Sequence, residues 1–235
     1  MKGLDQFQVI TTDRLYIKIA EQLRGLIKNG VYQPGDRFPA ERALAEKLGV
    51  SRPTIREAMI ALEISGIIEI RTGSGIYVSD KKSVTALEIT DKGIGPFEIL
   101  EMRYILEPEV CALAAVRITD EQIERLNLII KDMEEEEKQP NPSEKADGEF
   151  HMLIAEACQN SAMYLSVKWL WELRNKSVLS DSFLKVIRKE GVHPSIEDHK
   201  KIARALGQRN PERALLAMKN HIDNATINAA KHFEK

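Results

Sequence analysis

Apolar residues follow two different periods along the first 80 residues of this chain. Three segments place apolar residues every three or four positions, which is typical of amphipathic helices, and capping or glycine residues bound each of them. These segments span residues 12–30, 39–49 and 51–66. Two short apolar runs, 67–70 and 76–78, then flank the glycine-rich segment 71–75, which indicates a β-hairpin. The pattern predicts three helices followed by a hairpin.

The helical period returns after residue 95 and continues almost to the end of the chain. No period is present over residues 81–95, which predicts a linker. Turn and capping residues then separate the candidate helices, which span residues 96–117, 120–138, 143–158, 161–185, 194–207 and 211–233. The predicted fold class is therefore mainly α, with a small domain over residues 1–80 and an all-α bundle of about six helices over residues 96–235.

The second and third predicted helices have the spacing of a helix-turn-helix, in which the second helix enters the major groove of DNA. Gly49 permits the left-handed conformation of the intervening turn. The exposed start of the second helix of this pair carries Ser51, Arg52, Pro53, Thr54 and Arg56. Arginine can bond both major-groove acceptors of guanine, while hydroxyls and helix N-terminal amides suit phosphates. Alone, the pair can also be a helical hairpin with surface arginines; the adjacent hairpin, with Gly73 at its tip, favours a winged helix-turn-helix.

Composition and charge restrict how such a protein can act. Of the 235 residues, 43% are hydrophobic and 30% are charged, and no apolar run reaches the ~18 residues of a membrane span. The N-terminus lacks a signal-peptide core and only two cysteines are present, so we expect a cytoplasmic protein without disulfides. The formal net charge is −2, and the first 80 residues carry eleven Lys or Arg against ten Asp or Glu. DNA binding must therefore depend on a few placed charges, used twice by a dimer.

Five segments of the N-terminal third resemble the winged helix of GntR-family regulators. They are residues 34–42, 44–45, 49–52, 54–58 and 73–75, within a resemblance that covers about residues 12–79. The resemblance implies a bacterial, nucleoid-associated homodimer that binds a short palindromic operator in double-stranded DNA. It also implies that Arg42, Arg52 and Arg56 contact bases or phosphates and that Gly73 enters the minor groove. Pro53 varies a position that also faces DNA in relatives, which leaves the base preference there open.

Histidines in the second half provide candidate metal ligands. Asp147 and His151 are four residues apart on a predicted helix, so both project from one face and can share an ion. His199 and His221 lie on two later helices, each among apolar residues. Three imidazoles and a carboxylate can hold a divalent transition metal and leave coordination positions open. By spacing alone, the alternative is a surface Asp/His pair with unrelated core or surface histidines.

The same residues resemble the FCD ligand domain of the FadR-type branch of the GntR family. The motifs are Asp147-x-x-Phe150-His151, Asp198-His199 and His221-Ile222, within a resemblance that spans about residues 96–233. It implies that Asp147, His151, His199 and His221 bind the metal, with Zn, Ni, Mn, Co and Fe as candidates. It further implies a small carboxylate effector that coordinates the metal.

Four residues are candidates for binding that effector. Arg103 matches an arginine that clamps the acid in relatives, although alone it can be an exposed residue on an amphipathic helix. Trp171, Arg174 and Asn175 can supply polar and stacking contacts to a hydroxylated ligand. The alternative for the tryptophans at positions 169 and 171 is a core or dimer contact.

A narrower resemblance concerns repressors of hexuronate catabolism. It rests on residues 62–64, 75–78 and 95–100, and on Trp171 three positions before Arg174. It implies a hexuronate-type sugar acid as the effector of a carbohydrate or organic-acid catabolic operon. Alternatives within the family are lactate, pyruvate, gluconate, a dicarboxylate or a fatty-acid derivative as effector, or a purely structural metal.

A metal-dependent hydrolase is an alternative from another class of function. A three-histidine site with an open position can activate water, and Glu149 is an available base. On an ideal helix, however, Glu149 points away from the face of Asp147 and His151. The sequence has no nucleophile or oxyanion-hole signature, so we predict a regulator and not an enzyme.

Overall fold

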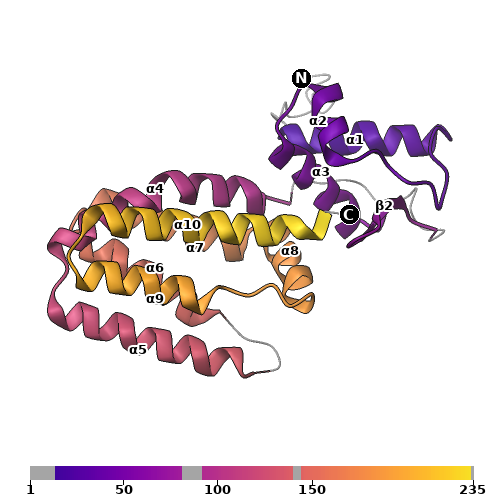
Figure 1. Cartoon of the computed structure of the whole chain (residues 1–235). Coiled ribbons are helices and arrows are strands. Elements are labelled where there is room, and N and C mark those ends of the chain that lie inside the picture. Colours follow the sequence, from indigo (N-terminus) through magenta and orange to yellow (C-terminus); the bar gives the residue numbers. More distant parts are fainter. Residues whose placement is uncertain (1–13, 81–91, 140–143, 234–235) are drawn as a thin grey trace, which may run out of the picture. The chain divides into compact units, whose positions relative to one another are not determined.

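The computed structural model describes residues 14–80, 92–139 and 144–233 (Figure 1). The predicted Thr12-Asp13 helix cap and residues 81–91 of the predicted linker lie outside these ranges. The chain divides into two compact units. One contains the N-terminal helices and hairpin, and the other contains the helices that follow residue 92.

The N-terminal unit contains three helices followed by an antiparallel hairpin, as the hydrophobic pattern predicts. Its elements are α1 (Leu15–Lys28), α2 (Glu41–Leu48), α3 (Arg52–Ile64), β1 (Ile68–Arg71) and β2 (Gly75–Val78). Gly49 ends α2 with a φ of 66°, and the Ser51 Oγ caps α3 by accepting a hydrogen bond from the Thr54 N–H at 3.3 Å. The predicted start of the second helix at Pro39 is wrong by two residues, because α2 begins at Glu41.

α3 is the central helix of this unit. Its residues from Ile55 to Leu62 are buried, and it packs against α1 and α2. Arg52 at the start of α3 is exposed and the next two residues are half-buried, so the helix is anchored along its length while its N-terminal end reaches solvent. The Phe38 N–H, in the segment before α2, donates to the Ile76 carbonyl on β2 at 2.8 Å. This hydrogen bond attaches the hairpin to the helical part of the unit.

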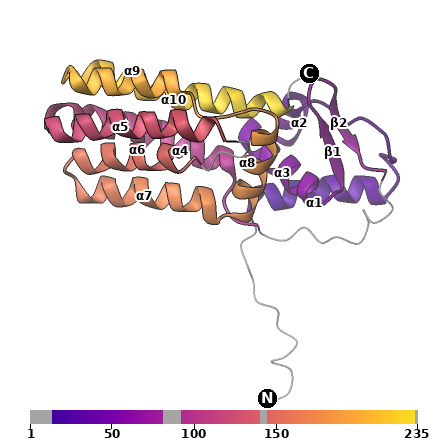
Figure 2. The same cartoon turned by 90° about the horizontal axis from the view of Figure 1, so that it is seen from below.

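The second unit is an all-α bundle. Its elements are α4 (Pro96–Arg117), α5 (Asp120–Glu137), α6 (Lys145–Ala157), α7 (Ser161–Lys176), α8 (Val178–Lys189), α9 (Ile196–Gly207), α10 (Pro211–Ala230) and a 3-10 turn η2 (Lys231–Phe233). α4 packs against α6 to α10, while α5 packs against α6 and α9 (Figure 2). Among the described residues, none of these helices combines the length and apolar character that a membrane crossing requires.

The prediction of one helix over residues 161–185 is wrong, because α7 ends before Ser177 and α8 begins after it. Ser177 has extended backbone angles, and its Oγ accepts from the Ser180 N–H at 3.4 Å and donates to the Ile94 carbonyl at 2.5 Å. A serine in this conformation starts a new helix, since its side chain satisfies one of the open N-terminal amides. A Cβ on Gly93 would lie 2.7 Å from the Ser177 Oγ, so glycine is required for this close approach.

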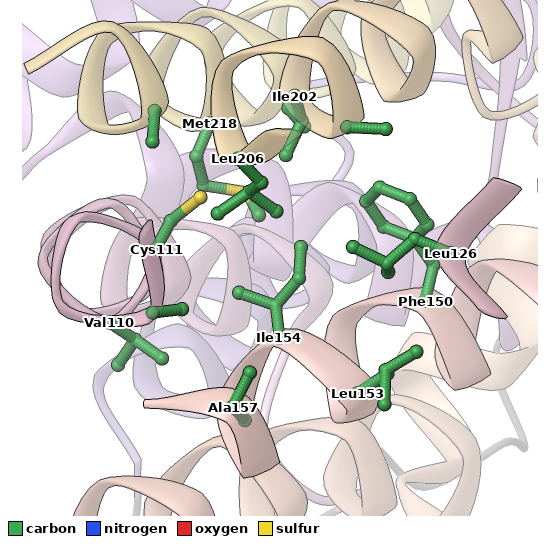
Figure 3. Close-up of a cluster of buried hydrophobic side chains, with 14 of the residues drawn as sticks. Val110, Cys111, Leu126, Phe150, Leu153, Ile154, Ala157, Ile202, Leu206 and Met218 are labelled. Carbon is green, nitrogen blue, oxygen red and sulfur yellow. The ribbon is translucent and has the colours of Figure 1, made fainter. Parts of the chain in front are cut away.

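The core of the bundle lies where α4, α5, α6, α9 and α10 meet. Apolar side chains from all five helices converge there (Figure 3). Phe150 and Ile154 on α6 face Leu126 on α5, Ile202 on α9 and Met218 on α10. Each of these side chains is at most 1% exposed. Phe150 immediately precedes His151, so the same packing that buries the core also fixes the position of that histidine.

Candidate functional site

Four predicted metal ligands come together in the bundle. Asp147 and His151 lie on α6, His199 on α9 and His221 on α10, and all four are buried. One potential ligand atom from each residue lies within 4.8 Å of those from the other three. Residues separated by up to 74 positions thus present a carboxylate and three imidazoles to a common point. Because all four side chains are buried, their neighbours restrict the rotamers that they can adopt, which favours selective binding of an ion.

The hydrogen bonds of His199 leave its Nε2 as the ring atom that could bind a metal. Its Nδ1 lies 2.8 Å from the Ser195 carbonyl, which can only accept, so Nδ1 carries a proton. In the neutral ring Nε2 then carries no proton but a lone pair, and this atom lies 3.0 Å from the Asp147 Oδ1. Two acceptors at this distance repel each other unless a cation lies between them or His199 gains a second proton. This arrangement fits a metal ion bound by both atoms.

His151 has the same arrangement, with Glu107 as the orienting group. Its Nδ1 lies 2.5 Å from the Glu107 Oε2, and its Nε2 faces the Asp147 Oδ1 at 3.7 Å. Glu107 also accepts from the Arg103 Nε at 2.7 Å and from the Trp171 Nε1 at 3.2 Å. Carboxylates in this position fix the tautomer and orientation of a ligating imidazole. Sequence reasoning missed Glu107, because it lies 44 positions before His151 and no spacing rule connects them.

Burial and neighbouring charges set the protonation of the cluster. Burial opposes ionisation of Glu107 and Asp147, but it is outweighed: Arg103 and His151 hold the pKa of Glu107 well below its usual range. Hydrogen bonding to His199 and the charges of His151 and Arg174 likewise hold down the pKa of Asp147. Burial lowers the pKa of His151, and it lowers that of His221 further below the usual histidine range. Ionised carboxylates and neutral imidazoles are the forms that bind metals.

A cavity opens beside the cluster. It contains about 690 Å³ of empty space, counting the part open to solvent, and Asp147 and His221 line it. Two of the predicted effector-binding residues, Arg103 and Arg174, also line this cavity. The other two are placed elsewhere. Trp171 is buried behind Arg103, whose Cζ lies 4.3 Å from the centre of its ring, and Asn175 is exposed to solvent.

Trp171 and Asn175 are not among the residues that line this cavity. The indole of Trp171 packs between the guanidinium groups of Arg103 and Arg174, at 4.3 and 5.1 Å from their Cζ atoms. It also packs against His151, with ring centroids 5.0 Å apart. Trp171 thus contacts two cationic candidate residues and one candidate metal ligand, and its burial matches the core role left open from the sequence.

A second buried carboxylate, Glu144, ties three helices together at the cavity. It precedes α6 with a left-handed φ of 54°, and its Oε2 accepts from the Arg174 Nη2 at 2.6 Å and from the Arg188 Nη2. Both arginines line the cavity. The Arg174 Nη2 also lies 3.9 Å from the Asp147 Oδ2, so Glu144 and Asp147 together balance the two guanidinium groups. A bound divalent cation would then give this region a net positive charge, which favours an anionic ligand.

The base considered for hydrolysis does not belong to the cluster. Glu149, the base considered for hydrolysis, is exposed, and its Oε1 lies 3.4 Å from the Lys145 Nζ on the outer face of α6. It is therefore separated from the buried face that carries Asp147 and His151.

The predicted DNA-binding residues lie on the exposed end of the N-terminal unit's helix pair and on the hairpin tip. Ser51, Arg52 and Gly73 are exposed, and Pro53 and Thr54 are half-buried. The Arg42 side chain is 82% exposed and pairs with Glu46 at 3.1 Å. Arg56 differs from the others, because its side chain is only 9% exposed.

Glu41 connects the two arginines of the third helix, and sequence reasoning missed this contact. The Arg56 Nε and Nη2 donate to its two carboxylate oxygens at 2.6 and 2.8 Å. The Arg52 Nε donates to the Glu41 Oε1 at 2.8 Å. Arg52 nevertheless remains half exposed. Glu41 thus holds the Arg52 guanidinium in a fixed orientation at the start of α3, which reduces the entropy cost of a later contact.

Comparisons with known proteins cover both units. Residues 15–78 match the family described as bacterial regulatory proteins, gntR family, and residues 98–224 match the FCD domain. The chain is 34% identical over 217 residues to the Uxu operon regulator of Haemophilus influenzae, covering 92% of this chain and 82% of that protein. Two Escherichia coli K12 proteins are similarly close. The Uxu operon transcriptional regulator is 36% identical, covering 91% and 86%, and the Exu regulon transcriptional regulator is 35% identical, covering 91% and 84%.

Proposed function

Because the chain belongs to the gntR family of bacterial regulatory proteins and carries an FCD domain, it is a transcription regulator and not an enzyme, and we propose that it represses a sugar-acid catabolic operon. The proposed effector is a hexuronate-type acid whose carboxylate binds a metal held by Asp147, His151, His199 and His221. The observation that carries this proposal is the buried aspartate and histidine cluster, which borders a cavity lined by arginines.

Two further observations support a sugar acid. Three relatives that are 34–36% identical to this chain are named for the Uxu operon and the Exu regulon, in agreement with the resemblance to hexuronate repressors. The cavity would also carry excess positive charge once a divalent cation is bound, since Glu107, Glu144 and Asp147 balance only the three arginines Arg103, Arg174 and Arg188. A bound cation would offer open coordination positions to a carboxylate, and Arg103 would clamp the same group.

Operator binding should respond to such an acid only when the metal is present. In a titration of the purified protein on an operator fragment selected from random DNA, D-glucuronate should lower the affinity about tenfold or more, a typical size for coupling between two sites. After treatment with a chelator, the acid should have no effect, because its carboxylate then lacks its main partner. Lactate and pyruvate serve as comparison acids. Operator affinity that no acid changes, with or without metal, would contradict the proposed function.

We further propose that the bundle forms the homodimer. α4 and α7 pack on each other, and both leave large apolar side chains exposed. These are Met102 and Ile105 on α4, and Leu165 and Trp169 on α7, each between 44% and 64% exposed. Large exposed apolar residues on adjacent helices are typical of a protein–protein interface.

The variant Trp169→Glu should therefore be monomeric under conditions in which the wild type is dimeric. A charge in an apolar interface costs several kcal/mol, about enough to dissociate a micromolar dimer. Sedimentation velocity provides the measurement. The matched control is Leu128→Glu on α5, which changes a residue of similar exposure outside these two helices. A dimer that survives Trp169→Glu, or dissociates equally in Leu128→Glu, would place the interface elsewhere.

A further inference from the structure

The cavity has a second group of polar side chains in its lining, separate from the four residues of the metal cluster and from Arg103. It is formed by Ser180 and Arg188 on α8 and by His193 in the connection to α9, and we call it the α8 wall. Among the residues that the structure describes, the Ser180 Oγ, the Arg188 Nε and the His193 Nδ1 are buried and have no hydrogen-bond partner. Buried polar atoms nearly always have one, so three such atoms on one cavity wall indicate a ligand that supplies the partners.

Ser180 carries the strongest part of this argument. Ser180 is 1% exposed, and no residue that the structure describes supplies a hydrogen-bond partner for its Oγ. It lies in the first turn of α8, which is fixed by the Ser177 cap. Arg188 follows eight positions later, about two helical turns, so both residues are on the same face of α8. Leu184 and Ile187 line the cavity from the same face.

The chemistry of the α8 wall suits hydroxyl groups. A serine hydroxyl both donates and accepts, and a neutral histidine nitrogen does one or the other. The Arg188 Nε can only donate, and its charge is held near Glu144 by the Nη2 contact, so it does not require a second carboxylate. The α8 wall thus offers hydrogen-bond donors and acceptors, and Glu144 already compensates the charge of Arg188. Such a wall suits neutral oxygens on a ligand, such as the hydroxyls of a sugar chain.

We propose that the α8 wall binds the hydroxyl-bearing chain of the effector and so selects polyhydroxylated acids over short ones. This inference rests on the proposed function, since it assumes that the carboxylate of the acid faces Arg103 and the cluster. Arg103 and Asp147 near the cluster and the residues of the α8 wall line the same cavity, so one ligand can contact both regions. A short acid would fill only the region near the cluster and leave the α8 wall without partners.

Two acids that share a carboxylate end test this inference by calorimetry. D-Glucuronate carries an oxygen next to its carboxylate and a hydroxylated chain, and glycolate carries only the carboxylate and the adjacent hydroxyl. In Ser180→Ala the affinity for D-glucuronate should fall by about tenfold, the usual size for loss of a buried hydrogen bond, while that for glycolate should stay within about twofold. Arg188→Lys, which keeps a cation near Glu144 but removes Nε, should give the same selective loss.

Ser182→Ala on the same helix is the control, since Ser182 is half-buried and contributes no part of the cavity lining. Metal content and thermal unfolding of each variant establish that the cluster and the fold are intact. Equal losses for both acids, or unchanged D-glucuronate affinity in both variants, would overturn the inference while leaving the proposed function standing. A wild type that binds glycolate but not D-glucuronate would overturn both.

Discussion

Replacing His199 with alanine should remove the bound metal from the purified protein and abolish its response to a sugar acid. The His199 ring is fully buried, and its protonated Nδ1 leaves Nε2 as the atom that faces Asp147 at 3.0 Å. Without this ligand, two imidazoles and one carboxylate remain. We expect metal content to fall from one ion per chain to a small fraction, and D-glucuronate affinity to fall about 100-fold, equivalent to about 2.7 kcal/mol.

Elemental analysis and calorimetry measure the two effects. Operator affinity without any acid should be retained, because the residues predicted to bind DNA lie in the N-terminal unit, and this shows that the variant is folded. Asp147→Asn provides a second variant that keeps side-chain size and removes charge. His232→Ala is the control, since this buried histidine pairs with Glu190 outside the cluster. A His199→Ala protein that keeps both its metal and its response would show that the cluster is not the metal site.

Among alanine variants of the predicted DNA-binding residues, Arg52→Ala should cause the largest loss of operator affinity. Its guanidinium is half exposed at the start of α3 and is oriented by Glu41, so it is prepared for a bidentate contact with a guanine. Loss of one such contact costs about 1–3 kcal/mol, and a dimer loses two, which amounts to about 2–6 kcal/mol. Base preference should also relax at one position of each half-site.

Fluorescence anisotropy on the selected operator and on single-base variants of it measures both effects. The control is Arg24→Ala on α1, which removes an arginine of the same unit that pairs with Glu21. If Arg52→Ala leaves affinity and base preference unchanged, Arg52 does not read a base. A uniform loss across all base variants would instead assign it to a phosphate.

The hydrophobic pattern predicts most of the fold because the elements have strong local signals. Ser51 and Gly49 bound their helices as expected, and glycine at the tip of the hairpin marks the turn. The break at Ser177 was missed because its cap is preceded by Asn175 and Lys176, which do not interrupt a helical pattern, and because its second partner, Ile94, is 83 positions away. Local sequence contains no information about such a partner.

The candidate site was predictable only in part for the same reason. Spacing identifies Asp147 and His151 as a pair, and the resemblance adds His199 and His221. Glu107, Glu144 and the α8 wall depend on which helix faces lie together in the folded bundle. Glu41 is similar: its carboxylate meets Arg52 and Arg56 only after α2 and α3 have packed. Ordinary charged residues acquire specific partners through tertiary structure, and sequence alone does not distinguish them from surface residues.

Ser177 has a mechanical consequence. One hydroxyl joins the first turn of α8, which carries Ser180 in the cavity wall, to the carbonyl of Ile94, two residues before the start of α4. The cavity wall and the start of α4 therefore share an anchor. A ligand that displaces the start of α8 must either move Ile94 with it or break the hydrogen bond between the Ser177 hydroxyl and the Ile94 carbonyl.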